Sequence, residues 1–254
     1  KTPGHPEYGH TKGVETSTGP LGQGFANAVG MAIAEKHLAA KFNKDDLKIV
    51  DHYTYVLVGD GCLQEGIQYE AASLAGTLKL GKLICIYDKN NITIEGDIKN
   101  AFSEDVGARH QALGWHVVKV EDGTDIDAVS LAIEEAKKVT DKPSIIICRT
   151  EIGYGCPAKQ GKASAHGEPL GEDNIKATKE ALGWDYAPFE IPEDVRQHTK
   201  EIANRGRDYE ETWNKTVESY KAKYPELYKE YTLWMQRKFP VDLENNDDFW
   251  KFDE

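Results

Sequence analysis

The alternation of short β-branched runs with longer segments of helical periodicity constrains this chain more than any other feature. Runs rich in Val, Ile and Tyr occupy Tyr53–Val58 and Leu83–Tyr87 and predict two strands. Between them, apolar residues recur at helical spacing, at Leu63, Ile67, Leu74 and Leu78. Because a helical crossover joins strands that run in the same direction, these residues predict a parallel pair of strands.

The same alternation continues for the next part of the chain. A helix is predicted around Asp105–Leu113, a strand at His116–Val120, a helix with apolar positions at Ile126, Val129, Ile133 and Ala136, and a strand at Ser144–Cys148. Repeated strand and helix units of this kind favour an α/β fold built on a doubly wound parallel sheet.

The regions on either side of this alternation are different in character. A Gly-rich and Pro-rich loop precedes a predicted helix at Phe25–Phe42, and the segment Glu193–Phe239 is predicted to be mostly helical. We therefore expect an α/β domain over residues 1–190, a helical appendage of the same domain over 191–240, and an acidic, linker-like end over 241–254.

Charge and composition exclude several functional classes. The chain has 254 residues and a net charge of -12 without a basic stripe, so neither nucleic acid nor a membrane is an expected partner. No apolar run approaches the roughly 20 residues of a membrane span. The four cysteines form no close metal or redox pair, and no signal peptide begins the chain, so reduced thiols in the cytoplasm are expected.

The segment Gly59-Asp60-Gly61 lies where a predicted strand ends, which is the edge at which parallel α/β sheets bind ligands. Glycines on both sides of Asp60 would allow a phosphate to approach the backbone. Taken alone, the segment is weak evidence, because an aspartate that caps a helix in a tight turn is the more frequent explanation of such a pattern.

Asn90 follows the neighbouring predicted strand, so its side chain and that of Asp60 are expected to project toward one point. The carbonyl of Ile92 would add a third oxygen. Magnesium prefers about six oxygens in octahedral geometry, and such a site would leave room for diphosphate oxygens and water. An Asx turn at Asn90 is the alternative interpretation.

Five segments resemble the transketolase family in the same order along the chain. They are Thr-Pro-Gly-His-Pro-Glu at Thr2–Glu7, Thr-Gly-Pro-Leu-Gly-Gln-Gly at Thr18–Gly24, Gly-Asp-Gly-Cys-Leu-Gln-Glu-Gly at Gly59–Gly66, Asp-Lys-Asn-Asn-Ile-Thr-Ile-Glu-Gly at Asp88–Gly96, and His-Gly-Glu-Pro-Leu at His166–Leu170. The resemblance covers roughly residues 1–240 and implies the thiamine-diphosphate-binding fold.

The resemblance also implies roles for individual residues. It makes Asp60, Asn90 and Ile92 the ligands of Mg²⁺, for which Ca²⁺ or Mn²⁺ can substitute. Residues implied to line thiamine diphosphate are Gly19, Pro20, Leu21, Asp60, Gly61, Glu65, Asn90, Ile94 and His166. His5 and His166 are implied to be catalytic, and Glu65 and Glu70 to lie in a chain of carboxylates between two cofactor sites.

The implied activity is transfer of a two-carbon ketol unit from a ketose phosphate to an aldose phosphate, in the pentose phosphate pathway. A pyrimidine-binding domain of a second subunit would complete each site, which implies a homodimer. Dihydroxyacetone synthase, with formaldehyde as acceptor, shares the segments and stays an alternative. Because the resemblance covers only part of a transketolase, a non-catalytic cofactor-binding module is the second alternative.

Overall fold

The computed structural model describes residues 4–238 and 245–252. Thr2 and Pro3 of the first motif, and residues 241–244 and 253–254 of the predicted linker-like end, lie outside these residues. The chain divides into two compact units, which are described separately. The first contains the residues up to Lys36 together with His52–Ala187, and the second contains His37–Asp51 together with the residues from Pro188 on. The domain limits expected from the sequence stay predictions.

The first unit is built on a parallel sheet of four strands in the order β1-β2-β6-β5. The strands are β1 (Thr54–Gly59), β2 (Leu83–Lys89), β5 (His116–Val120) and β6 (Ser144–Arg149). Its helices are α1 (Gln23–Phe42), whose last residues belong to the second unit, α2 (Gly66–Thr77), α3 (Val106–Ala112), α4 (Ile126–Lys138) and α5 (Glu172–Ala181). The doubly wound parallel sheet expected from the sequence is confirmed.

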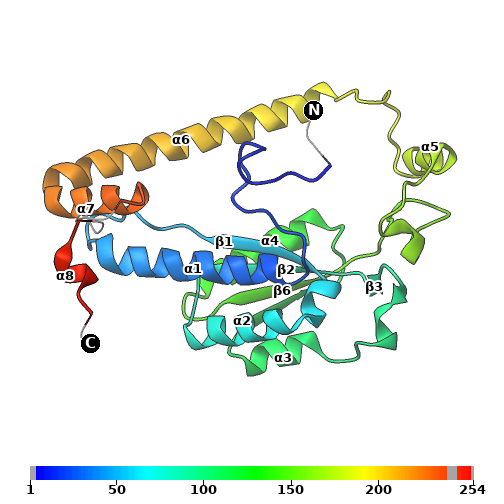
Figure 1. Cartoon of the computed structure of the whole chain (residues 1–254). Coiled ribbons are helices and arrows are strands. Elements are labelled where there is room, and N and C mark those ends of the chain that lie inside the picture. Colours follow the sequence, from blue (N-terminus) through cyan, green and yellow to red (C-terminus); the bar gives the residue numbers. More distant parts are fainter. Residues whose placement is uncertain (1–3, 239–244, 253–254) are drawn as a thin grey trace. The chain divides into compact units, whose positions relative to one another are not determined.

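Both faces of the sheet are covered (Figure 1). On one face, residues of α1, α2 and α3 form a core with Cys85, Tyr87 and Ile145. On the other face, Ala132 and Ala136 of α4 pack with buried side chains of β2, β5 and β6. Burial on both faces explains why these strands are continuous apolar runs rather than alternating ones.

Aspartates set the beginnings of two helices. The carboxylate of Asp105 accepts a hydrogen bond from the amide of Ala108 at the start of α3, and Asp125 does the same for Ala128 at the start of α4, each at 3.0 Å. These N-caps satisfy amides that have no partner within the helix. Their sequence positions agree with the helices expected there.

Short elements fill the connections. The hairpin of β3 (Ile92–Thr93) and β4 (Gly96–Asp97) follows β2 and is followed by the 3-10 turn η2 (Ile98–Asn100). The turn η1 (Gly61–Gln64) follows β1, and η3 (Ala163–Ala165) lies within the loop expected over 151–170. The hairpin and α5 were not predicted from the sequence.

The second unit is helical, as expected for the appendage. Helix α6 (Glu193–Lys223) is followed by α7 (Pro225–Met235), whose first residue is a proline, and a single turn, α8 (Asp247–Trp250), lies further on. Buried Tyr220 packs with Phe42, and its hydroxyl donates to the Phe42 carbonyl at 2.6 Å. The Trp213 indole donates to the Ile49 carbonyl at 3.0 Å. These bonds attach α6 to the last residue of α1 and to the short segment that follows it.

The apolar residues that predicted α2 do not form its buried face. Ile67, Leu74 and Leu78 are exposed in this chain, whereas Ala72 and Ala75 are fully buried against the sheet. Small residues allow the helix axis to approach the sheet closely, so helical spacing correctly indicated a helix but not the side that packs. None of the described helices is both long and apolar enough to cross a membrane.

Candidate functional site

The candidate site begins at the carboxyl end of β1. Gly59 pairs with Asp88 in the parallel register of β1 and β2, so the residues that follow each strand leave the sheet at the same edge. Asp60 comes directly after Gly59 and is 2% exposed. Although Asp60 occupies the N-cap position of η1, its side chain makes no capping bond. The simple capping interpretation of this aspartate is therefore wrong.

The Asp60 carboxylate instead accepts bonds from the end of β2 and the residues beyond it. Its Oδ1 accepts from the Tyr87 hydroxyl at 2.5 Å, and its Oδ2 accepts from the amides of Asn90 and Asn91 at 3.1 and 2.8 Å. Burial raises the pKa of Asp60, while these hydrogen bonds act in the opposite direction. Burial and the bond to Asp60 raise the pKa of Tyr87, so its hydroxyl stays protonated and donates.

Asn90 and Ile92 are held beside this carboxylate. The side-chain oxygen of Asn90 accepts a hydrogen bond from the Ile92 amide at 2.9 Å, which is the Asx turn that the sequence left as an alternative. Because an amide oxygen has two acceptor positions, this turn leaves one for another ligand. The Asn90 amide group lies 3.5 Å from a carboxylate oxygen of Asp88, and Asp88 also accepts a bond from the Thr150 hydroxyl.

The residues present fit a magnesium ion. They offer one buried carboxylate, one amide oxygen and one backbone carbonyl, which are hard oxygen donors. Within residues 4–238 and 245–252, Asp60 forms no ion pair, and a buried carboxylate gains from a bound cation. No three His, Cys, Asp or Glu side chains in the described part of the chain cluster to hold a metal. Of the three predicted magnesium ligands, only Asp60 belongs to these residue types, because the other two are the Asn90 amide oxygen and the Ile92 carbonyl.

The loop Gly19–Leu21 lies close to the turn after Asp60. A methyl group placed on Gly61 would lie 3.1 Å from the Leu21 side chain. Gly22 has a φ of +83°, and a Cβ there would lie 2.8 Å from Ile67 and 2.9 Å from Glu65. Only glycine fits such a position without strain. The loop is thereby held against the first residues of α2, with Leu21 beside Gly61.

A buried network supports the same turn from behind. The Arg109 guanidinium donates to the Leu63 carbonyl at 3.3 Å and to the Gln68 side-chain oxygen at 3.1 Å, and it also pairs with Glu104. It lies over the Tyr69 ring at 3.9 Å from the centroid. Since the Leu63 amide donates to the Asp60 carbonyl at 3.2 Å, Arg109 holds the far end of the turn that Asp60 begins.

His110 belongs to this network and is fully buried. Its Nδ1 lies 2.8 Å from the Val106 carbonyl, and its Nε2 lies 3.1 Å from the Gln68 amide nitrogen. A carbonyl can only accept, so Nδ1 carries the proton and Nε2 accepts from Gln68. Burial lowers the pKa of His110 to about 4, which keeps the ring neutral.

A family model described as transketolase, thiamine diphosphate binding domain, matches residues 1–240. The chain belongs to this family.

Curated relatives and solved structures agree with the family. A transketolase from a Nostoc species is 57% identical over 239 residues, which are 94% of this chain and 36% of the relative. Transketolase 1 of Escherichia coli is 52% identical over 244 residues, which are 96% of this chain and 37% of the relative. The chain therefore spans little more than a third of the length of these transketolases.

Two solved transketolases have the same fold. A transketolase from Pichia stipitis, in complex with sedoheptulose 7-phosphate, matches with a TM-score of 0.92 at 46% identity. A transketolase from Leishmania mexicana matches with a TM-score of 0.92 at 44% identity. Each match covers 96% of this chain and 36% of the solved chain.

Within the described residues, the two histidines that transketolase motifs single out take no part in the hydrogen bonds around Asp60. The His5 ring is exposed, and its Nδ1 lies 3.5 Å from a carboxylate oxygen of Glu7. His166 is exposed at the end of η3, where its amide bonds to the Ala163 carbonyl at 2.9 Å. Among the described residues, neither imidazole forms a hydrogen bond or ion pair with Asp60 or Asn90. Their catalytic assignment stays a prediction.

The remaining predicted residues are also exposed in this transketolase-family chain. Glu65 occupies the N-cap position of α2 without a side-chain capping bond, and Glu70 lies one turn further along the helix. Ile94 lies at the tip of the β3–β4 hairpin and is 68% exposed. Gly19 and Pro20 are exposed in the same loop as Leu21. Their roles toward the cofactor or a second subunit stay predictions.

Sequence reasoning missed Tyr87 and Thr150. Both act on the predicted site through another side chain, Tyr87 through Asp60 and Thr150 through Asp88. A signal for Tyr87 was present, because a tyrosine with its polar hydroxyl stands near the end of an otherwise apolar strand. A hollow of about 450 Å³ also opens beside Asn90, with Thr150 and Ile152 among its walls. None of the sequence motifs indicated this hollow.

Proposed function

We propose that the protein carrying this chain is a transketolase, which transfers a two-carbon ketol unit from a ketose phosphate to an aldose phosphate in the pentose phosphate pathway. The observation that carries the proposal is the family match over residues 1–240, joined to a buried Asp60 carboxylate beside Asn90 at the carboxyl edge of the sheet. Dihydroxyacetone synthase is the second candidate, since its segments are similar.

In this proposal Asp60, Asn90 and the Ile92 carbonyl hold Mg²⁺, and the metal holds the diphosphate of the cofactor. Thiamine diphosphate, when bound, supplies an electron sink that stabilises the cleaved two-carbon fragment. The chain contributes the groups that bind the diphosphate. The turn after Asp60 begins with half-buried Gly61, and its backbone amides are proposed to donate hydrogen bonds to anionic oxygens of the cofactor.

The exposed apolar side chains near this turn are proposed to shield the cofactor from water. Leu21 stands beside Gly61, and Ile94 is offered by the tip of the hairpin. Both side chains are largely exposed in the chain, which is consistent with a role in contacting a bound ring system. Apolar contact would orient the ring without competing for its polar atoms.

His5 and His166 are proposed to exchange protons with the sugar. Histidine suits this work because its ordinary pKa of about 6.5 is close to neutral pH. The Nδ1 atom of His5 faces Glu7, so its Nε2 atom is the one presented to a substrate hydroxyl. His166 stands in an exposed loop, where its ring contributes little to the core.

We further propose that the active protein is a homodimer in the cytoplasm. The pyrimidine-binding domain of a second subunit would supply the glutamate that activates the cofactor, and Glu65 and Glu70 would lie at that interface. All four cysteines of the chain are unpaired thiols, which is consistent with a reducing compartment.

An acceptor assay tests the function. The complete polypeptide that carries these residues should convert xylulose 5-phosphate with ribose 5-phosphate as acceptor, in a reaction that needs thiamine diphosphate and Mg²⁺. Faster turnover with formaldehyde would favour dihydroxyacetone synthase instead. Residues 1–254 alone should be inactive and regain turnover when the missing domains are added; no turnover by the complete polypeptide with either acceptor would favour a non-catalytic module.

A further inference from the structure

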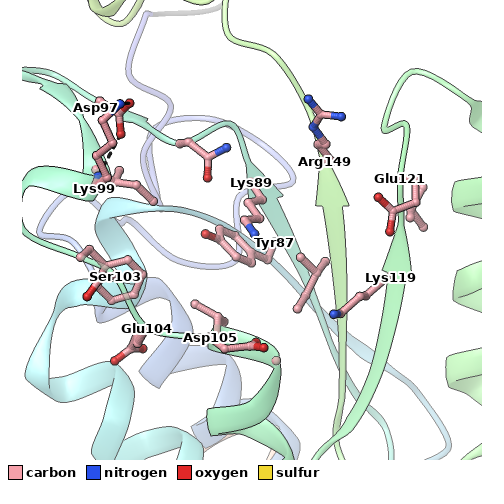
Figure 2. A pocket seen from close by; sticks show the side chains of 17 residues that line it. Tyr87, Lys89, Asp97, Lys99, Ser103, Glu104, Asp105, Lys119, Glu121 and Arg149 are labelled. Carbon is pink, nitrogen blue, oxygen red and sulfur yellow. Dashed lines mark hydrogen bonds and ion pairs between the residues drawn. The ribbon is translucent and has the colours of Figure 1, made fainter.

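A second hollow opens at the carboxyl edge of the sheet, on the face that carries α3 (Figure 2). It has a volume of about 740 Å³, and Tyr87, whose hydroxyl donates to the Asp60 carboxylate, is among its lining residues. None of the predicted cofactor and metal residues is among its lining residues. The predicted roles of the transketolase motifs therefore leave this hollow without an occupant.

Three neighbouring strands present cations to this hollow on one face of the sheet. Lys89 ends β2, Arg149 ends β6 and Lys119 lies near the end of β5. Side chains alternate between faces along a strand, so these three share the face of Tyr87, Ile147 and Val117, which contact the core under α3. Lys89 and Lys119 point into the hollow, and Arg149 stands at its rim (Figure 2).

The register brings two of these cations together. Lys89 and Arg149 are direct partners on adjacent strands. Like charges at paired positions repel each other. In the described part of the chain, Lys89, Arg149 and Lys119 form no ion pair, whereas Lys99 on the same hollow pairs with Asp97 at 2.9 Å. An anion bound between the strand ends would relieve this repulsion, and it would do so in a chain that is otherwise strongly acidic.

The opposite wall of the hollow is polar and carries hydrogen-bond acceptors. Asp105 uses one oxygen to cap α3, and its pKa is lowered first by that bond and further by Lys119 and Lys89, whose charges reach it. Ser103 also lines this wall, whereas Glu121 lies on the side of Lys119 and Arg149 (Figure 2). A carboxylate and a hydroxyl on this wall can hydrogen-bond the hydroxyl groups of a sugar or polyol, whereas a carboxylate would repel a second phosphate.

The topology favours a ligand at this place. The chain leaves β2 toward α3 on one face of the sheet, and it leaves β5 toward α4 on the other face. Between these strands the direction of winding changes, and open α/β sheets bind ligands where it changes. Lys89, Arg149 and Lys119 come from the strands that flank this change of direction and from the strand between them.

We propose that this hollow binds a small phosphorylated polyol, with the phosphate held by Lys89, Arg149 and Lys119 and the hydroxyl groups facing Asp105 and Ser103. The ligand shares a wall with the predicted metal site. Tyr87 and Asn91 line the hollow, and both donate hydrogen bonds to Asp60. Binding in the hollow is therefore expected to change the affinity of the predicted metal site.

Calorimetric titration of the complete polypeptide, saturated with thiamine diphosphate and Mg²⁺, tests the proposal with glycerol 3-phosphate as the probe. Inorganic phosphate and glycerol are the reference ligands. Glycerol 3-phosphate should bind more tightly than either, and its affinity should fall as salt is added.

Variants locate the binding. Lys89→Met and Arg149→Met should each weaken binding about tenfold, because each removes a charge-assisted hydrogen bond. Lys89→Arg should retain most of the affinity. Lys142→Met, at the exposed amino edge of the sheet, is the matched control and should bind like the unchanged protein. Thermal melts would confirm that the variants fold, since the altered side chains are exposed.

Equal affinity in Lys89→Met, Arg149→Met and the control would overturn the proposal. Absence of binding in the complete polypeptide would do the same, including the case in which another part of the protein fills the hollow. Equal affinity for inorganic phosphate and glycerol 3-phosphate would overturn the assignment of the polyol. None of these outcomes depends on the proposed ketol transfer.

Discussion

The turn at Asp60 and the two predicted catalytic histidines differ in how firmly the surrounding residues hold them. The Asp60 carboxylate is 2% exposed and accepts three hydrogen bonds, and the turn behind it is held by Arg109. His5 and His166 lie in exposed loops, and His5 Nδ1 lies 3.5 Å from a carboxylate oxygen of Glu7.

This difference teaches that the sheet preorganises the predicted metal ligands, whereas the described residues leave the two predicted catalytic histidines exposed. Bonds between buried groups persist without a ligand, because breaking them would leave a desolvated carboxylate unpaired. Exposed loop side chains lose rotamer freedom when they order, so a bound cofactor or a further domain must offset that cost.

The largest effect should come from Asp60→Asn. The substitution keeps the shape of the side chain but removes the only charged ligand of the predicted metal. Affinity for thiamine diphosphate in the presence of Mg²⁺ should fall by at least about a thousandfold, since changes beyond the ligand shell already cost about 10–100-fold. Calorimetric titration measures it, with Asp141→Asn, an exposed carboxylate, as the control. Unchanged affinity would remove the metal assignment.

Acid should lower the stability of the folded chain, because His110 in the network around Arg109 becomes protonated. Its pKa is about 4 in the folded chain against an ordinary value of 6.5, so the unfolded chain binds more protons between these pH values. The stabilisation is complete above pH about 7, declines as the pH falls through 6.5 and is lost near pH 4. The loss should reach about 3 kcal/mol in the free energy of unfolding.

Chemical denaturation at a series of pH values checks this expectation, with His110→Phe as the comparison. Other carboxylates also titrate in this range, so the informative quantity is the difference between the two proteins. The phenylalanine variant should be less stable at pH 7 and should lose less stability on acidification. Parallel curves for the two proteins down to pH 4.5 would contradict the assignment.

A smaller effect is expected from Tyr87→Phe, which removes the hydroxyl bond to Asp60 and keeps the ring. Magnesium affinity should fall about tenfold, because partners that orient a metal ligand contribute about that much. Tyr53→Phe is the matched control, because the Tyr53 hydroxyl donates to the Lys137 carbonyl at 3.4 Å and not to Asp60. Equal effects of the two substitutions would show that the Asp60 contact has no special role.

The smallest effect is expected on stability when His5 or His166 is replaced. His5→Ala and His166→Ala should each change the free energy of unfolding by less than about 0.5 kcal/mol, because exposed loop side chains contribute little packing. Turnover of the complete polypeptide should nevertheless fall, more for His166, and His5→Ala should chiefly impair use of the donor. Steady-state kinetics beside thermal melts separate the two quantities, and a large loss of stability with normal turnover would reverse the comparison.

The sequence predicted the sheet well because parallel strands are buried on both faces. Such strands are continuous apolar runs, and Tyr53–Val58 differs from the observed β1 by a single residue at each end. The buried face of α2 could not be predicted, since Ala72 and Ala75 carry no strong hydrophobic signal while exposed Leu74 does. The β3–β4 hairpin was missed because two-residue strands give no periodicity.

At the site, the convergence of Asp60 and Asn90 follows from the parallel register and was predictable. The contacts of Asp60 were not, because its partners are backbone amides and a tyrosine whose orientation depends on the packed sheet. The network of Arg109, Gln68 and His110 joins residues from two helices and has no sequence pattern. Long-range polar contacts of this kind become visible only in the folded chain.

The position of β6 has a consequence for how the chain is made. This strand is the last of the sheet in sequence, yet it lies between β2 and β5. During synthesis, Ser144–Arg149 must therefore leave the ribosome before the sheet can be completed. Until then β2 and β5 each lack a neighbour, and unpaired strand edges favour association with other chains. Nascent chains that stall before Ser144 should consequently be the ones that need a chaperone.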